Sequence, residues 1–533
     1  MLILLALVSI VIVTCVLCNK LSNRMGVPVL LAFILLGVAF GSDGIFKIHF
    51  DDFVLVERVC TIALIFIMFY GGFGTNWKEA RVVAPKALML SSLGVVITAF
   101  LVGVFCYHVL HFEWLESLLI GAVLSSTDAA SVFSVLRSKQ LNLKYGTASL
   151  LELESGSNDP WAYMLTVLIL SVMRGESGTP VSIMTTVLQQ VLVGLIVGML
   201  IAWIGMWAIR HIDFETSGFD TIFVVAIALM AYTFPSLLGG NGYLSTYIVG
   251  LVLGNVTLPD KKRMVHFFDG ATGLMQMLVF FLMGLLAFPS QMPSILLPAV
   301  AIFLFLTFIA RPLAVCPLLS VFRSNLSQQS VVSWAGLRGA ASIVFAIMVT
   351  VDDAYTKNDV FHIVFCVVLL SIGVQGSLLP LISRRLHMID NSQDVMKTFN
   401  DYTEESSLQF VALTLEKGHE WIGRQIQSII LPPQMRIAYI RRGEEQVIPR
   451  GSTILEEEDI LIMSAVEYQG SRPIAMKEVY VDKKHKWNNR QLNELELPHS
   501  RIVLIKRKGH SFAPTGESRI VEGDMLVLIG DEI

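Results

Sequence analysis

Charged side chains are scarce in this sequence. Asp, Glu, Lys and Arg together make up 15% of its 533 residues, whereas soluble domains contain about 25%. Hydrophobic residues make up 54%, and the mean hydropathy is +0.66. This composition excludes an ordinary soluble protein and indicates a polytopic α-helical membrane protein in a lipid bilayer. The formal net charge of −4 gives no indication of nucleic-acid binding.

Cysteines and nucleotide motifs are also few. All six cysteines lie in apolar runs, which argues against a disulfide scaffold or a zinc site. Cys15 and Cys18 form a C-x-x-C inside a lipid-length helix with no second pair, so we interpret them as small apolar filler. No G-x-G-x-x-G, Walker motif or Asp-Lys-Thr-Gly is present, which excludes a Rossmann site and a primary pump. We expect no enzymatic activity, no cofactor and no metal beyond a transported cation.

Charge returns near the C-terminus. After Asn400 lie 17 of the chain's 39 Lys and Arg residues and 21 of its 43 Asp and Glu residues. We therefore expect a transmembrane domain over 1–386, a linker over 387–407, and a C-terminal cytoplasmic α+β tail.

Hydrophobic runs of about 20 residues predict membrane spans. The first run lacks a basic leader and a small-residue cleavage site, so we expect a retained span and not a signal peptide. We place thirteen spans at 2–18, 27–42, 57–74, 83–110, 115–136, 147–173, 181–210, 219–237, 243–256, 264–287, 294–322, 329–351 and 360–383.

The basic residues predict the orientation. With the N-terminus outside, the inner loops hold fifteen Lys and Arg residues and the outer loops and span edges four, as the positive-inside rule requires. An odd number of spans then places the tail in the cytoplasm of a multi-pass cell-membrane protein.

Three polar segments interrupt the apolar runs, at 125–131 in the fifth span, 151–161 at the head of the sixth, and 336–342 in the twelfth. An ionised side chain in hydrocarbon costs roughly 2.5–3.5 kcal/mol, so such groups line polar cavities and have functions. The fifth and twelfth spans are seven apart, which predicts opposite orientations. This pattern is typical of inverted repeats, in which broken helices cross and form an ion site.

The residue spacing in the sixth span predicts its chemistry. Ser155 and Asp159 share one helix face, Glu154 and Asn158 share another, and Pro160 leaves a backbone carbonyl free. A proton and a monovalent cation both neutralise Asp159. If only the neutralised state crosses the membrane barrier, protons and cations exchange.

These motifs resemble the monovalent cation/proton antiporters of the NhaP-like branch. The matching elements are Thr127-Asp128, Glu154-x-x-x-Asn158-Asp159-Pro160, Arg311-Pro312 and Gly336-Leu337-Arg338-Gly339, in the family's order. The resemblance covers most of the membrane part and implies thirteen helices, a homodimer, and spans 4–6 and 11–13 as a core that moves against a dimerisation scaffold.

The resemblance also implies residue roles. Asp159 is the shared cation and proton carboxylate, Ser155 and the Thr127 carbonyl help to coordinate the ion, and Asp128 lies by the unwound crossing. Glu154 pairs with Arg338, and Arg311 lies near Asn158. Asn158 also stands where electrogenic relatives have a second aspartate, so we expect electroneutral one-for-one exchange. One departure is Tyr70, where many relatives carry an acid, which leaves the choice of sodium or potassium open.

The tail contains an internal repeat at an offset of 65 to 66 residues. His419, Trp421 and Arg424 recur as His485, Trp487 and Arg490, and the match continues to Leu461 and Leu526. Each unit is predicted to contain a strand, a short helix and two further strands, at 408–415, 436–441 and 459–463 and at 478–481, 501–506 and 524–529.

The units, at 408–470 and 471–533, resemble the TrkA C-terminal domain of potassium-conductance regulators (RCK-C). The resemblance implies dimerisation and a small anionic ligand, for which we select a cyclic dinucleotide. Its candidate ligands are the basic residues at equivalent places, Arg436, Arg441, Arg442, Arg501, Lys506 and Arg507. A structural dimer clamp, or a solvated charged face, is the alternative.

The sequence is thus interpreted as a proton-coupled antiporter for a cytoplasmic monovalent cation, regulated by its tail. Potassium is favoured over sodium because of the TrkA-like tail and the missing acid at Tyr70. A Na+/H+ antiporter is the alternative. A regulated cation channel is the competing class, but no repeated carbonyl filter or acidic ring is visible.

Overall fold

The structure is a computed structural model of the whole chain. It describes residues 9–10, 12–17, 29–139, 141–176, 179–212, 218–258, 261–354, 356–390, 408–415, 417–429, 431, 435–443, 445–466, 476–483, 485–495, 500–507, 510–512 and 514–530. Residues 391–407 of the expected linker, 387–407, and most of the expected first span lie outside these residues, although 9–10 and 12–17 are helical. The chain divides into two compact units, 1–403 and 404–533.

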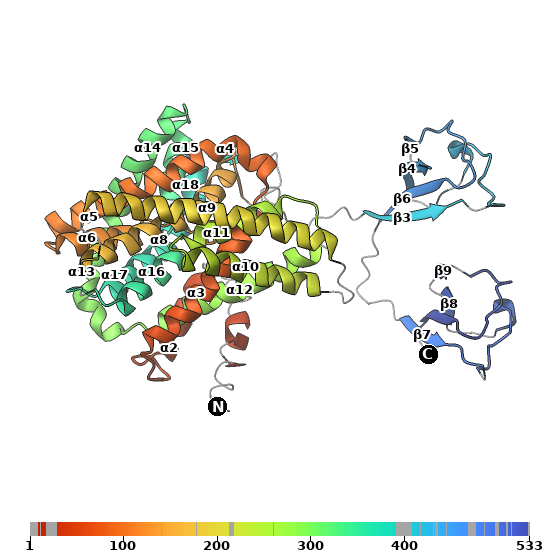
Figure 1. The fold of residues 1–533 in the computed structure, drawn as a ribbon, viewed down its shortest axis with the longest axis horizontal. Helices are drawn as coiled ribbons and strands as arrows, with labels where there is room; N and C mark the ends of the chain where they lie inside the picture. Colours follow the sequence, from red (N-terminus) through yellow and green to blue (C-terminus); the bar gives the residue numbers. More distant parts are fainter. Residues whose placement is uncertain are drawn as a thin grey trace. The chain divides into compact units, whose positions relative to one another are not determined.

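The first unit is a bundle of α-helices (Figure 1). Its helices are α2 Val29–Phe40, α3 Phe53–Gly74, α4 Trp77–Met89, α5 Val95–Val109, α6 Trp114–Val123, α7 Ala129–Ser138, α8 Thr147–Met173, α9 Pro180–His211, α10 Phe219–Leu237, α11 Gly242–Gly254, α12 Lys261–Leu285, α13 Met292–Phe305, α14 Arg311–Val321, α15 Leu326–Trp334, α16 Ala340–Val351, α17 Val360–Leu370 and α18 Ser377–Arg385.

The expected spans from 27–42 onward each coincide with a helix or a linked pair of helices. Within the described residues, seven helices are long and apolar enough to cross a membrane, and four apolar helices are shorter. Three pairs are joined by π-helical turns at Leu90–Gly94, Leu306–Ala310 and Ser371–Gly376. The fifth and twelfth spans are instead broken, between α6 and α7 and between α15 and α16.

Glycines allow close packing between helices outside the two broken spans. A Cβ at Gly72 of α3 would lie 2.3 Å from the Tyr247 carbonyl of α11, and one at Gly250 would lie 2.2 Å from the Phe69 carbonyl. Gly37 of α2 and Gly284 of α12 face each other's helix in the same way. Small residues at such contacts are how helices associate in lipid, where no hydrophobic effect drives them together.

A two-stranded sheet connects the start of α8 with the end of α18. β1, Asn142–Leu143, pairs antiparallel with β2, Ile389–Asp390, and the Lys144 amide donates to the Met388 carbonyl over 2.8 Å. The end of the last helix is therefore fixed to the segment that leads into α8.

The second unit contains two four-stranded antiparallel sheets of the same topology. One has the order β3-β6-β4-β5 and the other β7-β10-β8-β9. The strands are β3 Leu408–Thr414, β4 Arg436–Arg442, β5 Glu445–Val447, β6 Ile460–Val466, β7 Met476–Tyr480, β8 Ser500–Arg507, β9 His510–Phe512 and β10 Met525–Gly530. The six predicted strands are confirmed, β5 and β9 were not predicted, and the short helices are single 3-10 turns, Ile426–Ser428 and Leu492–Glu494.

An irregularity at the same place in each sheet sets which side chains are buried. The β4–β6 register shifts between Ile437 and Tyr439, so Ile437 and Ile440 both face the core although they are three residues apart. Ile502 and Ile505 do the same in the second sheet. The sequence repeat is therefore a repeat of structure.

Candidate ion-binding site

The two breaks meet in the middle of the bundle. The Asp128 amide donates to the Leu337 carbonyl over 2.8 Å, which ties the unwound segment after α6 to the one after α15. Arg338 Nη1 donates to the carbonyls of Ser125 at 2.9 Å and Ser126 at 2.6 Å. A buried guanidinium thus satisfies carbonyls that the break leaves without helical partners.

The glycines of 336–339 provide room at this crossing. A Cβ at Gly336 would lie 2.6 Å from Arg311 Nε, and one at Gly339 would lie 2.1 Å from Asp128 Oδ2. The spacing of the two glycines therefore follows from the two charged side chains that pack against them.

Helix α8 places Ser155, Asn158 and Asp159 against the first break. Ser155 Oγ donates to the Thr127 carbonyl at 2.6 Å and accepts from the Ala129 amide at 2.7 Å. Asn158 Nδ2 donates to Thr127 Oγ1 at 2.5 Å. Ser155, Asn158 and Thr127 therefore fix the unwound backbone relative to α8.

Asp159 and Asp128 differ in their hydrogen bonds. Asp159 is 6% exposed, and its carboxylate accepts from Ser126 Oγ. Asp128 accepts from Ser131 Oγ and, at 3.0 Å, from the Ala130 amide, so it caps the start of α7. Within the described part of the chain, no Lys or Arg forms an ion pair with either carboxylate.

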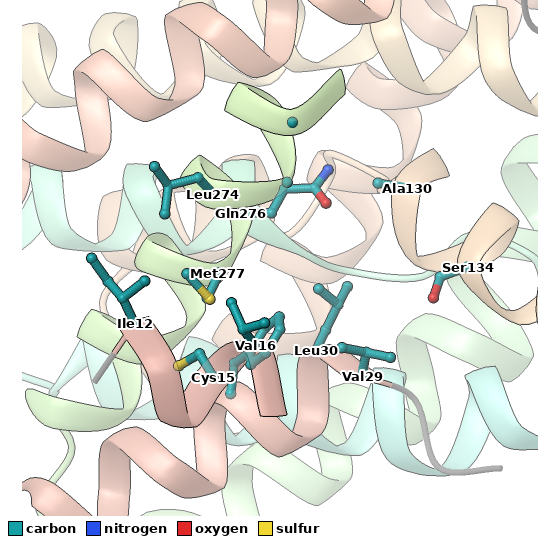
Figure 2. A pocket seen from close by; sticks show the side chains of 13 residues that line it. Ile12, Cys15, Val16, Val29, Leu30, Ala130, Ser134, Leu274, Gln276 and Met277 are labelled. Atoms are coloured by element: carbon teal, nitrogen blue, oxygen red, sulfur yellow. The ribbon is translucent and has the colours of Figure 1, made fainter. Parts of the chain in front are cut away.

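A cavity of about 340 Å³ reaches this site. Asp128, Ser155 and Asp159 line it, whereas Thr127 and Asn158 do not. The opposite wall of the cavity is formed by α3, with Tyr70 and Gly71, and by α12, with Asp269, Thr272, Gly273 and Gln276. Glu152 of α8 also lines the cavity. A second cavity of about 630 Å³ shares Ala130, Ser134, Gly273 and Gln276 with the first (Figure 2).

The expected ion pair between Glu154 and Arg338 is wrong. Glu154 pairs with Arg311, and both side chains are at most 2% exposed. Arg311 begins α14, directly after a π-helical turn, and Gly336 gives its guanidinium room to reach α8. Arg338 uses the carbonyls at the crossing instead. Glu154, the partner of Arg311, stands one helical turn before Asn158 on α8. Within the described part of the chain, Arg311 Nε and Nη1 have no hydrogen-bond partner.

The tail arginines fall into two groups. Arg442 binds Asp459 through Nε and Nη2, both at 2.8 Å, and Arg507 binds Asp524 in the same way at 2.7 and 2.8 Å. Burial alone would raise the pKa of each aspartate, but the hydrogen bonds from the arginine and from a backbone amide outweigh it and lower both pKa values.

This arrangement corrects the candidate ligand set of the tail. Arg442 and Arg507 neutralise aspartates that are 0% exposed, and a buried carboxylate requires such a partner. The guanidinium nitrogens that bind these aspartates are therefore not free to hold a ligand, although each arginine side chain stays about one third exposed. Arg436, Arg441 and Arg501 are exposed, and Lys506 is half-buried.

Sequence reasoning missed four features of the site. Ser126 was part of the polar break but was not selected as the partner of Asp159. Arg311 was not selected as the partner of Glu154. Asp269 and Thr272 of α12 line the cavity, and the signal was available as a polar pair, three residues apart, in an apolar span.

Comparisons with known proteins identify the family of this chain. The family model of the sodium/hydrogen exchanger transmembrane region matches residues 7–385, and that of the TrkA-C domain matches 410–466. The K+/H+ antiporter NhaP of Alkalimonas amylolytica is 32% identical over 83% of this chain and 78% of its own. The K+/H+ antiporter NhaP2 of Shewanella oneidensis is 34% identical over 85% and 79%.

The fold is also similar to a solved structure. The sodium proton antiporter MjNhaP1 from Methanocaldococcus jannaschii at pH 8 superposes with a TM-score of 0.64 at 24% identity, over 72% of this chain and 99% of that one. The chain therefore belongs to the sodium/hydrogen exchanger family, and it is a multi-pass membrane cation/proton antiporter and not an enzyme.

Proposed function

We propose that this antiporter exchanges cytoplasmic K+ for protons, one for one, with Asp159 as the carboxylate that binds both. The observation that carries the proposal is a buried carboxylate at the crossing of two broken helices, open to a cavity and without a basic partner among the described residues. The names of the relatives, which are K+/H+ antiporters, favour potassium.

Exchange follows from competition at Asp159. A charged carboxylate is costly in a low-dielectric setting, so it is neutralised either by a proton or by a cation. Ser155 lines the same cavity and offers a hydroxyl oxygen, the Thr127 carbonyl is hydrogen-bonded to that hydroxyl as a second candidate oxygen ligand, and Asp128 provides a second carboxylate at the start of α7. If only the neutral site moves between the two membrane sides, each cation that leaves is matched by a proton that enters.

Asn158 supports electroneutral exchange. Its amide is fully buried and holds Thr127, and an amide carries no second proton. An imposed membrane potential should then neither drive nor oppose transport, and a current on a solid-supported membrane that scales with turnover would contradict this stoichiometry.

We assign to this antiporter thirteen spans, an N-terminus outside the cell and a cytoplasmic tail, on the distribution of basic residues. Two contacts join segments that are next to basic residues in the sequence. Asn255, beyond α11, accepts from the Trp77 amide at the start of α4, and the Lys144 amide donates to the Met388 carbonyl. The cavity is lined by Tyr70, one turn from the end of α3, and by Asp269, about two turns from the start of α12. It therefore lies nearer the basic side, which we assign to the cytoplasm.

The position of the cavity also supports a moving core. One wall is formed by α7 and α8, which belong to spans 5 and 6, and the other by α3 and α12, which belong to spans 3 and 10. A core of spans 4–6 and 11–13, related by inverted repeats, would move against a scaffold that forms the homodimer, with the ion site on the sliding surface.

The tail modules, which we place at 408–470 and 471–533, would regulate transport. The sheet of β1 and β2 fixes the start of the linker, 387–407, to the segment preceding α8, so tension on the linker would act on the helix that carries Asp159. A cyclic dinucleotide held by Arg436, Arg441, Arg501 and Lys506 is the proposed effector. A coupling of 1–3 kcal/mol between sites changes activity by roughly 5–150-fold.

One experiment tests the ion and the stoichiometry together. Proteoliposomes containing the full chain and a pH-sensitive dye are given K+, Na+, Li+ or Rb+, with and without an imposed voltage. We expect proton release from the lumen with K+ and Rb+, independent of voltage. A response to Na+ alone would support the alternative Na+/H+ antiporter, the activity named for a 24% identical relative, the low-affinity Na+/H+ antiporter NhaS1 of Synechocystis. Cation flux without proton movement would support a channel.

A further inference from the structure

The face of α12 that lines the cavity is polar, although the helix is otherwise apolar beyond the basic residues Lys261–Arg263 and His266 near its start. Asp269, Thr272, Gly273 and Gln276 stand at positions i, i+3, i+4 and i+7, which share one helix face. All four line the cavity that also contains Asp159, about 340 Å³ in volume. A polar stripe thus faces the ion site from the opposite wall.

Asp269 is an exposed carboxylate inside a membrane-length helix. Its Oδ1 accepts a hydrogen bond from Tyr70 Oη at 3.2 Å, and across the described residues no Lys or Arg forms an ion pair with it. Because a carboxylate in hydrocarbon is costly, its place on an open cavity means that water or a cation solvates it.

Thr272 provides an independent observation. Thr98, Thr166 and Thr246, on other helices, each donate to the carbonyl four residues earlier, at 2.7–2.8 Å. Thr272 is also buried, at 6% exposure, yet its Oγ1 has no hydrogen-bond partner among the residues that the structure describes. A hydroxyl that is buried, borders a cavity and makes no hydrogen bond is an oxygen available to a ligand.

The walls next to these groups are open. A Cβ at Gly71 of α3 or at Gly270 or Gly273 of α12 would meet no atom within 4 Å. Figure 2 shows Gln276 at the upper edge of the adjoining cavity, across from Ala130 of α7 and above the apolar side chains of Val16 and Leu30. The polar stripe therefore has space beside it for a hydrated cation, in the cavity that Asp159 also lines.

We propose that Asp269, Tyr70 Oη and Thr272 Oγ1 form a recruiting site for a hydrated monovalent cation on the way to Asp159. The inference rests on the proposed transport function. A negative charge in a narrow cavity concentrates counter-ions and accelerates their entry. Two sites in series, one at Asp269 and one at Asp159, also let an ion bind readily and leave readily, because neither site needs to bind it tightly. Asp269 sets the cation concentration at which transport saturates, and Asp159 performs the exchange.

Full-length protein in proteoliposomes tests this division of roles, with K+ and Rb+ as the cations. Asp269→Asn should raise the KM for K+ about tenfold and leave the rate at saturating K+ near that of the wild type. Thr272→Val removes the hydroxyl at nearly constant shape and should raise the KM for K+ less than Asp269→Asn does. Thr272→Ser keeps a hydroxyl and should have a KM near that of the wild type. Asp353→Asn removes an exposed acid after α16, outside the cavity, and should change neither parameter.

A swap variant tests position as well as charge. Because Tyr70 Oη lies beside Asp269, Tyr70→Glu combined with Asp269→Asn returns a carboxylate to the same part of the cavity and should lower KM again. An unchanged KM in Asp269→Asn, or a reduced saturating rate at unchanged KM, would overturn the recruiting site. If the wild type exchanges no monovalent cation at all, the proposed function fails instead.

Discussion

The carboxylates of the membrane site and of the tail differ in how many donors surround them. Asp459 accepts from two nitrogens of Arg442 and from the Glu456 amide, and Asp524 is bound in the same way. Asp159, similarly buried, accepts a side-chain hydrogen bond from Ser126 and faces a cavity. A carboxylate with all its acceptors used stabilises a fold, whereas one with acceptors left open to a cavity is able to bind a proton or a cation.

The arginines show the same difference. The side chains of Arg442 and Arg507 are about one third exposed, at 32% and 35%. Water therefore reaches the parts of each guanidinium that the aspartate does not bind. Arg311 and Arg338 are 1% exposed, and each has two nitrogens with no hydrogen-bond partner among the described residues. Such groups are costly to bury, and both contact the segments at which the helices are broken.

Asp159→Asn should have the largest effect, and it tests whether open acceptors distinguish the membrane carboxylate from the tail carboxylates. Asparagine has nearly the same shape and still accepts from Ser126, but it carries neither charge nor a transferable proton. We expect exchange in proteoliposomes to fall to the level of empty liposomes, while the purified protein elutes and melts like the wild type. Near-normal exchange would show that open acceptors do not mark the transport carboxylate. Asp353→Asn is the matched control.

Glu154→Gln should act on stability. It leaves Arg311 buried without its counter-charge, and breaking a buried ion pair costs on the order of 3–5 kcal/mol. A lowered melting temperature in detergent should therefore precede any change in ion selectivity. The double variant Glu154→Leu with Arg311→Met removes both charges and should be more stable than Glu154→Gln. Equal stability of Glu154→Gln and the wild type would show that the pair is dispensable.

The described helices and their breaks could be predicted from the sequence, because both appear as runs of apolar or polar residues along the chain. Hydrophobic runs located the helices, and the polar segments around Asp128, Asp159 and Arg338 located the crossing. Choosing between Arg311 and Arg338 as the partner of Glu154 was not possible, because that depends on a π-helical turn before Arg311 and on the room left by Gly336. The contact between Tyr70 and Asp269, 199 residues apart, is likewise set by how α3 and α12 pack.

The tail aspartates predict a pH dependence. Their folded-state pKa values are lowered, so their contribution to stability is present above the unfolded value of about 3.9 and is lost as the pH falls through the folded value. Hydrogen exchange of tail peptides in the full-length protein should therefore increase below about pH 4. Asp459→Asn should lower the free energy of opening of the first module by roughly 1.5–3 kcal/mol, so its hydrogen exchange should be faster even at pH 7. Unchanged protection in both cases would mean that the pairs do not stabilise the modules.

The smallest effect is expected at the exposed arginines, and it separates structure from ligand binding. Arg436 and Arg441 pair with Ser464 and Ile460 of β6, so they share the face opposite the core, where Ile437 and Ile440 lie. Substitution of either by alanine should change tail stability by no more than about 0.5 kcal/mol, whereas Arg442→Ala removes the counter-charge of a buried aspartate and should cost more. Calorimetry of the full-length protein with cyclic di-AMP then distinguishes a ligand site from a solvated face. If Arg436→Ala or Arg441→Ala abolishes binding and leaves hydrogen exchange unchanged, the exposed face is a ligand site. If cyclic di-AMP and adenine nucleotides bind neither the wild type nor the variants, the face is only solvated, and the topology that the two sheets share serves assembly.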